Sequence, residues 1–172
     1  ESLDYMERAW EDAKHGRASS DPVLDCTIPT VCDQTLLPPE HPDHHIMNIF
    51  AMYGPKELSG SSWTVEGPRF LDRVIAKLAE YAPNLPDAVV HRQIITPDDL
   101  ERRYSLTGGC IFHGTMSLDQ LFWARPLPSI ARYRGPVDGL YMCGAGTHPG
   151  GGVTGIPGLN ASREILRDSR DS

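Results

Sequence analysis

The chain has 172 residues, of which 40% are hydrophobic and 23% are charged, and its formal net charge is −7. This composition is typical of a soluble globular protein with one buried core or two small ones. The absence of any basic run argues against a nucleic-acid surface, because Lys and Arg are needed there to neutralise phosphates. The longest apolar runs are well short of a membrane span, which leaves only peripheral membrane contact open.

The cysteines are scattered along the chain, form no C-x-x-C pair, and follow no apolar secretory segment at the start of the sequence. They are Cys26, Cys32, Cys110 and Cys143. This pattern favours reduced thiols in the cytoplasm or another reducing intracellular compartment. We therefore discount "NAS" at Asn160 as a glycosylation acceptor, since it also falls inside a predicted helix.

The first elements are a helix and two strands. Apolar residues at helical spacing predict a helix over residues 2–15, which Gly16 is placed to end. Strands are predicted in "VLDCTIP" (23–29) and "HHIMNIFAMYG" (44–54), and the second is apolar on both faces, as in the centre of a sheet. The proline-rich segment between them is predicted to be a loop. Its histidines, in "HPDHH", complete no zinc-ligand pattern and are expected to be exposed.

A second helix is predicted over residues 67–83, with Pro68 in its first turn. Its apolar face, formed by Phe70, Val74 and Leu78, is expected to pack on the sheet that contains residues 46–52. The apolar segment "AVVHRQIIT" (88–96) then predicts a further strand.

The sequence after residue 96 alternates again between the two kinds of element. "TPDDLERRY" (96–104) has a Thr cap, Pro in the first position and acids in the first turn, which predicts a short helix. "GCIFHGTM" (109–116) predicts a strand, and Ser117 and Gln120 have the spacing of a capping box. The expected fold is therefore mixed α/β, with a sheet covered by helices.

Residues 139–168, "GLYMCGAGTHPGGGVTGIPGLNASREILRD", predict a strand, a turn with seven glycines between Gly144 and Gly158, and a helix. This arrangement brings backbone N–H groups and the positive end of a helix dipole against an anionic or electron-rich ligand. The spacing G-x-G-x-x-x-G differs from the pyrophosphate fingerprint of a Rossmann domain. Taken alone, the glycines fit a surface loop and a ligand-binding turn equally well.

The segment "LYMCGAGTHPGGGVTGIPG" resembles the carboxy-terminal flavin motif of phytoene desaturase-like oxidoreductases, carotenoid-desaturase relatives in the FAD-containing amine-oxidase-like superfamily. "LDQLFWARP" and "TIPTVCDQTLLPPEHPDHHIMNIFAMYGP" are similar to segments of the branch that contains pyridine-nucleotide-disulfide-oxidoreductase-like proteins, as is the stretch from Tyr81 to Gly114. The resemblance implies that residues 1–135 are part of a substrate domain and that residues 136–172 complete a flavin site. It also implies that the amino-terminal Rossmann part that binds FAD is absent from this chain.

The same resemblance places two groups of residues beside FAD. Gly144, Ala145 and Gly146 would lie beside the ribityl chain and the pyrophosphate. A second group would begin the helix that faces the flavin ring: Gly151, Gly152, Val153 and Thr154. Ala145 and Thr147 stand where amine oxidases often carry an acid, so ribityl recognition would be mostly through backbone groups. Without the Rossmann part, this chain alone is expected to retain FAD poorly.

The function implied by the resemblance is oxidation or desaturation of an apolar, isoprenoid-type small molecule by hydride transfer to flavin. No residue is assigned as catalytic, because the sequence has no Ser–His–Asp, Cys–His or carboxylate-pair pattern. His113 and His148 lie in segments that match the family, and Gln120, Arg125 and Pro126 either shape a substrate passage or form a cap and turn. The remaining arginines considered are expected to be surface charges: Arg102, Arg103, Arg132 and Arg134. The alternative is a non-catalytic binding or assembly module with a vestigial flavin turn.

Overall fold

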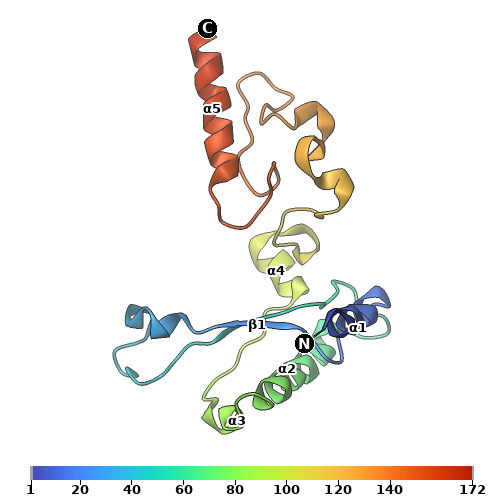
Figure 1. Ribbon diagram of the computed structural model, residues 1–172, viewed down its shortest axis with the longest axis vertical. Helices are drawn as coiled ribbons and strands as arrows, with labels where there is room; N and C mark the ends of the chain where they lie inside the picture. Colours follow the sequence, from blue (N-terminus) through green and yellow to red (C-terminus); the bar gives the residue numbers. More distant parts are fainter. Residues whose placement is uncertain (1, 172) are drawn as a thin grey trace. The chain divides into compact units, whose positions relative to one another are not determined.

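The computed structural model describes residues 2–171, and the chain divides into two units, Glu1–Pro97 and Asp98–Ser172 (Figure 1). The first unit contains α1 (Leu3–Lys14), β1 (Leu24–Thr27), β2 (Asn48–Ala51), α2 (Trp63–Ala79) and α3 (Leu85–Ala88). The second begins within α4 (Pro97–Tyr104), continues through short 3₁₀ turns and ends with α5 (Ile156–Asp171). This mixture of helices with a small sheet agrees with the expected fold class.

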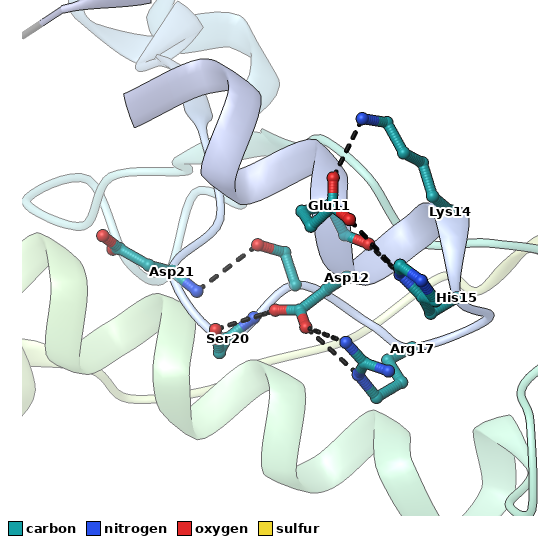
Figure 2. A network of polar contacts seen from close by, with 8 residues as sticks. Glu11, Asp12, Lys14, His15, Arg17, Ser20 and Asp21 are labelled. Atoms are coloured by element: carbon teal, nitrogen blue, oxygen red, sulfur yellow. Dashed lines mark hydrogen bonds and ion pairs between the residues drawn. The ribbon is translucent and has the colours of Figure 1, made fainter. Parts of the chain in front are cut away.

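Helix α1 confirms the prediction for residues 2–15. Its N-cap Ser2 accepts a hydrogen bond from the Tyr5 N–H, and Gly16 follows with φ of 69°, a left-handed conformation that favours glycine. Beyond the helix end, Asp12 accepts hydrogen bonds from the Ser20 N–H and hydroxyl, both at 2.8 Å, and from Arg17 (Figure 2). The Ser20 donors, with Arg17, lower the pKa of Asp12 and hold the chain reversal after α1.

Strands β1 and β2 form a two-stranded antiparallel sheet in which Leu24 pairs with Ala51 and Thr27 with Asn48. Both strand predictions are confirmed, but the expected central place of β2 is wrong. Strand β2 pairs only with β1 in the part of the chain that the structure describes, and Phe50 is half exposed. Its apolar residues therefore alternate between an inward and a solvated face, as in a sheet covered on one side.

Helix α2 begins at Trp63, four residues before the predicted start, so Pro68 lies inside it. The early start follows from burial of Trp63, whose ring packs edge to face on Phe70 at 5.9 Å and whose Nε1 donates to the Pro55 carbonyl at 2.9 Å. Trp63, Phe70 and Val74 form the core with Ala18.

The predicted contact between α2 and the sheet is confirmed. Side chains from both strands pack against this core together with Leu78: Leu24, Ile49 and Ala51.

The strand predicted at residues 88–96 is wrong, because this segment follows α3 as irregular backbone. Ile94 packs against the core and lies beside Gly67 of α2, and Thr96 is buried, whereas Val90 is exposed. The apolar side chains of this segment therefore reach the core directly, without joining the sheet.

In the second unit, α4 confirms the helix predicted at 96–104, and Arg102 and Arg103 are exposed charges that pair with Asp99. The strand predicted at 109–116 is wrong, since this segment is built of turns and has left-handed backbone at His113 and Gly114.

The Ser117 hydroxyl donates to Asp119 and makes no cap bond, so the capping box does not form. Two 3₁₀ turns occupy this stretch, Leu118–Gln120 and Phe122–Ala124, separated by extended backbone at Leu121.

Helix α5, red in Figure 1, confirms the helix predicted after the glycine turn and contains Asn160. The predicted strand before the turn is reduced to a single bridge between Tyr141 and Arg134. All four cysteines are free thiols. Within residues 2–171, no helix is both long and apolar enough to cross a lipid bilayer.

Candidate functional site

The glycine-rich segment folds as two consecutive turns in front of α5. In the first, the N–H and the hydroxyl of Thr147 both donate to the Gly144 carbonyl at 2.9 Å, and the Gly150 N–H donates to the Thr147 carbonyl at 2.7 Å. Thr147 is buried, so its side chain closes this turn from within. Gly144, Ala145 and Gly146 form the part of the turn that these bonds enclose.

The second turn depends on left-handed backbone. Gly152 has φ of 108° and Val153 has φ of 56°, while the Val153 side chain is fully exposed. A β-branched residue in this conformation is a true outlier, and such outliers concentrate where a site requires them. No packing contact accounts for the backbone at Val153, so a requirement of the turn itself is the better explanation.

The glycines of the turn fall into two kinds. A Cβ built on Gly150 would lie 3.1 Å from Cε of Met116, and one built on Gly151 would lie 3.4 Å from Cδ1 of Phe112. A Cβ built on Gly144 or Gly146 would meet no protein atom within 4 Å. Close packing explains the first pair, whereas the second pair borders open space in which a ligand can lie.

The turn also presents unpaired hydrogen-bond donors. Among residues 2–171, no intramolecular acceptor is bonded to the backbone N–H groups of residues 145–146 and 151–154. Two N–H groups further along are paired, because the Ile156 N–H donates to the Thr154 hydroxyl at 3.3 Å and the Leu159 N–H donates to the Gly155 carbonyl at 3.0 Å. Free N–H groups beside open space at the start of a 16-residue helix fit an anionic or electron-rich group such as a flavin.

Arg125 holds the first turn in place from behind. It is 1% exposed and donates from Nε and Nη2 to the Ala145 carbonyl, at 3.0 and 2.8 Å. The same guanidinium donates to the carbonyls of Thr115 at 2.9 Å, Phe112 at 2.6 Å and His113 at 3.3 Å. Of the two interpretations of Arg125 left open by the sequence, the structure favours the one in which it forms a turn.

Tyr133 ties the turn to α5. Its ring is 9% exposed, its hydroxyl donates to the His148 carbonyl at 2.8 Å, and the same oxygen accepts a bond from Nδ2 of Asn160 at 2.8 Å. His148 thus takes part through its backbone, and its ring lies 6.0 Å from the Phe122 ring. The position of α5 relative to the turn is therefore fixed by side chains outside the glycine motif.

A second polar cluster joins α5 to the bridge that precedes the turn. Arg134 donates to Glu164 and to both carboxylate oxygens of Asp168, and the Tyr141 hydroxyl donates to Asp168 at 2.6 Å. The Arg134 guanidinium first, and then the Tyr141 hydroxyl, lower the pKa of Asp168 from 3.8 to about 2. The Asp168 carboxylate raises the pKa of Tyr141. The expectation that Arg134 is an ordinary surface charge is wrong.

The other candidates contribute less to this arrangement. His113 is exposed, and Gln120, Pro126 and Arg132 lie at the surface or are half-buried. An open hollow of about 620 Å³ lies beside α5, and Phe122, Trp123, Arg132 and His148 are among its lining residues.

The histidines of the proline-rich loop form no metal centre. His41 and His44 stack with ring centroids 4.5 Å apart, and Nδ1 of His45 lies 3.1 Å from the Thr30 hydroxyl. In the described range, no three His, Cys, Asp or Glu side chains gather as metal ligands.

The sequence reasoning missed the supporting role of two arginines. For Arg125 a signal existed, because it follows the apolar stretch 121–124 and precedes a proline, an unusual setting for a surface charge. For Arg134 no local signal existed, because Glu164 and Asp168 lie 30 and 34 residues further along the chain.

The chain matches no protein-family model but is similar to several curated proteins. It is 45% identical over 168 residues to pyridine nucleotide-disulfide oxidoreductase domain-containing protein 2 of Mus musculus, over 96% of this chain and 28% of that protein. It is 32% identical over 164 residues to the lycopene-forming phytoene desaturase of Paracoccus sp., over 94% of this chain and 31% of that protein. It is 33% identical over 145 residues to a limonene dehydrogenase polypeptide of Castellaniella defragrans, over 83% of this chain and 26% of that protein.

The chain therefore spans less than a third of the length of each of these relatives. The matches nevertheless extend well beyond the glycine-rich turn, which occupies only a small part of the 168 aligned residues. Shared glycine content alone cannot produce such agreement. Over almost its whole length, the chain is a homologue of the phytoene desaturase-like oxidoreductases, a group to which it is related through pyridine nucleotide-disulfide oxidoreductase domain-containing protein 2 and the phytoene desaturases.

Proposed function

We propose that this chain is the flavin-completing portion of an FAD-dependent oxidoreductase that oxidises or desaturates an apolar small molecule, of isoprenoid type, by hydride transfer to flavin. The observation that carries the proposal is the turn at residues 144–154, where free backbone N–H groups border open space at the start of α5. It occurs in a homologue of proteins named for the hydrocarbons phytoene and limonene, which supports an apolar substrate.

Two parts of the turn have separate roles in this proposal. Gly144, Ala145 and Gly146 lie beside the ribityl chain and the pyrophosphate, where a side chain would occupy the space of the cofactor. Residues 151–154 direct N–H groups toward the flavin ring. FAD supplies the hydride-accepting chemistry, and the positive end of the α5 dipole stabilises the negative charge that reduction places on the ring.

The division of labour along the chain is part of the same proposal. Residues 1–135 contribute to a substrate domain, and residues 136–172 complete the flavin site, while a Rossmann part outside this chain binds the ADP half of FAD. The matched segment covers 28% and 31% of two of the relatives, which leaves room for such a part. None of the matches supports the alternative of a non-catalytic module.

The test is the flavin content of the complete protein that contains this chain. Purified after expression, it should carry FAD in equimolar amount, and an apolar isoprenoid supplied in detergent micelles without oxygen should bleach the flavin absorbance. The 172-residue chain alone should bind FAD weakly, because the Rossmann helix end that holds the pyrophosphate is missing. A colourless complete protein that cannot be reconstituted with FAD would contradict the proposal.

Gly144→Val tests the turn itself. Its Cβ would meet no protein atom within 4 Å and its φ is not left-handed, so the isolated chain should keep its melting temperature. In the complete protein the added side chain should displace FAD and lower its occupancy. Ser61→Val, in an exposed loop of the first unit, is the control and should change neither quantity. Full occupancy in Gly144→Val would remove the basis for calling this a cofactor turn.

A further inference from the structure

The buried guanidinium of Arg125 is not balanced by any acid. It makes five hydrogen bonds, and every acceptor is a backbone carbonyl oxygen. Among residues 2–171, no carboxylate forms an ion pair with it. Burying a charge is costly unless it is paired, and carbonyl dipoles satisfy the donors without cancelling the positive charge. A well-packed apolar residue would serve stability at least as well, so the charge calls for another explanation.

The geometry at Ala145 supplies one. The Ala145 carbonyl and the Gly146 N–H belong to one planar trans peptide, in which C=O and N–H point in opposite directions. Because Nε and Nη2 of Arg125 hold the carbonyl, the Gly146 N–H is turned away from the guanidinium. That N–H has no intramolecular acceptor within the described residues, and the space beside Gly146 is open to at least 4 Å.

Arg125 also reaches the rest of the turn. A Cβ built on Gly150 would lie 3.8 Å from its Nε, and its bonds to the 112–115 carbonyls attach the turn to the preceding loop. The positive charge therefore lies directly behind the peptide that faces the open space. In a buried setting such a charge acts over a short distance with little screening, so it favours an anionic group on the open side.

We propose that Arg125 is a positioning residue that aims the Gly146 N–H at the pyrophosphate of FAD and supplies the positive charge behind it. This inference rests on the proposed function, and it concerns the anionic half of the cofactor only. It follows that Arg125 distinguishes FAD from a flavin without phosphates. Riboflavin has the same ring and ribityl chain but no pyrophosphate, and is the matched probe.

The experiment compares the affinities of FAD and riboflavin in apoprotein prepared from the complete protein. Arg125→Met removes the charge and the donors, Arg125→Gln keeps a donor without charge, and Arg125→Lys keeps the charge without the planar fork. We expect Arg125→Met and Arg125→Gln to weaken FAD binding about tenfold more than riboflavin binding. Arg125→Lys should regain part of the preference for FAD. Arg102→Met, at a side chain that is 73% exposed on α4, should leave both affinities unchanged.

The outcomes separate the role of Arg125 from the function itself. If a folded Arg125→Met or Arg125→Gln variant weakens FAD and riboflavin by the same factor, or weakens neither, the inference about Arg125 is overturned. If Arg125→Met does not fold, the comparison of Arg125→Gln with Arg125→Lys decides in the same way. If the wild-type protein binds neither FAD nor riboflavin, the proposed function fails with it.

Discussion

The two units of the chain are held together by different forces. In the first unit the residues hidden from solvent are mainly apolar, with Trp63, Phe70 and Val74 packed between α2 and the small sheet. In the second unit the hidden residues include Arg125 and Thr147, whose polar atoms are bonded to backbone carbonyls. The first arrangement derives its stability from burial of apolar area, whereas the second uses buried polar groups to fix the shape of one turn.

The second unit also leaves many large apolar side chains in solvent, among them Leu118, Trp123 and Val153. Single exposed apolar residues need no explanation, but this unit has almost no apolar core in exchange. The comparison teaches that sequence hydrophobicity alone does not locate the core. Where the fold serves to shape a turn, hydrogen bonds do much of the work that packing does elsewhere.

The largest expected effect tests the apolar core of the first unit. Val74→Asp places a carboxylate at a position that is 3% exposed and has no cation beside it in the core cluster, so it should lower the free energy of unfolding by about 3–5 kcal/mol. Val65→Asp, on the same helix at a side chain that is 52% exposed, should cost less than about 0.5 kcal/mol. Urea denaturation of the two variants measures the difference, and equal midpoints would show that the core is placed wrongly.

A smaller effect contrasts left-handed glycines of the two units. Gly16→Val strains a φ of 69° and brings Cβ within 3.2 Å of the Ser59 backbone nitrogen, which should cost about 1–3 kcal/mol of stability without changing flavin content. Gly152→Val strains a φ of 108°, but its Cβ meets only Thr154, at 3.8 Å. In the complete protein it should therefore lower FAD occupancy as well as stability. Melting temperature and flavin absorbance separate the two variants, and unchanged occupancy in Gly152→Val would count against a cofactor turn.

The polar support of the second unit is tested by Tyr133→Phe. This change removes the hydroxyl that donates to the His148 carbonyl and accepts from Asn160, so two buried polar groups lose a partner. We expect a loss of about 1–2 kcal/mol. Tyr104→Phe, at a ring that is 61% exposed, is the matched control and should be silent. If both variants unfold at the wild-type urea concentration, hydrogen bonds do not hold this unit in the way proposed.

The difference between the units also decides how much could be predicted from sequence. Helical spacing identified α1, the buried face of α2 at Phe70 and Val74, and the helix after the glycine turn, because local periodicity reports which face is apolar. It failed at residues 88–96, because an apolar run does not tell whether a neighbouring strand is available to pair with it. There Ile94 packs on the core by its side chain alone.

For the candidate site, the glycine pattern located the turn but not what supports it. The placement of residues 144–146 and 151–154 around FAD stays a prediction, although open space and free N–H groups are found beside several of them. Arg125 and Arg134 escaped prediction because their acceptors come from distant parts of the chain. Polar networks of this kind have no period in the sequence, whereas apolar faces do.

The smallest effect concerns the charge cluster that joins α5 to the preceding bridge. The pKa of Asp168 is lowered from 3.8 to about 2, first by Arg134 and then by the Tyr141 hydroxyl. A carboxyl group whose pKa is depressed on folding stabilises the folded state above its ordinary pKa, and that contribution is lost as the pH falls through the folded value. The stabilisation from Asp168 should thus be complete above about pH 3.8 and disappear as the pH approaches about 2.

Titration of the Asp168 carboxyl carbon by NMR measures this directly. In Arg134→Met the pKa should return most of the way toward 3.8, because the guanidinium is the largest cause of its shift. In Tyr141→Phe it should rise less, because only the hydroxyl donor at 2.6 Å is lost. If the two variants shift the pKa equally, or if the wild-type value is already 3.8, the ion pair is not formed in solution and α5 is held by Tyr133 and Asn160 alone.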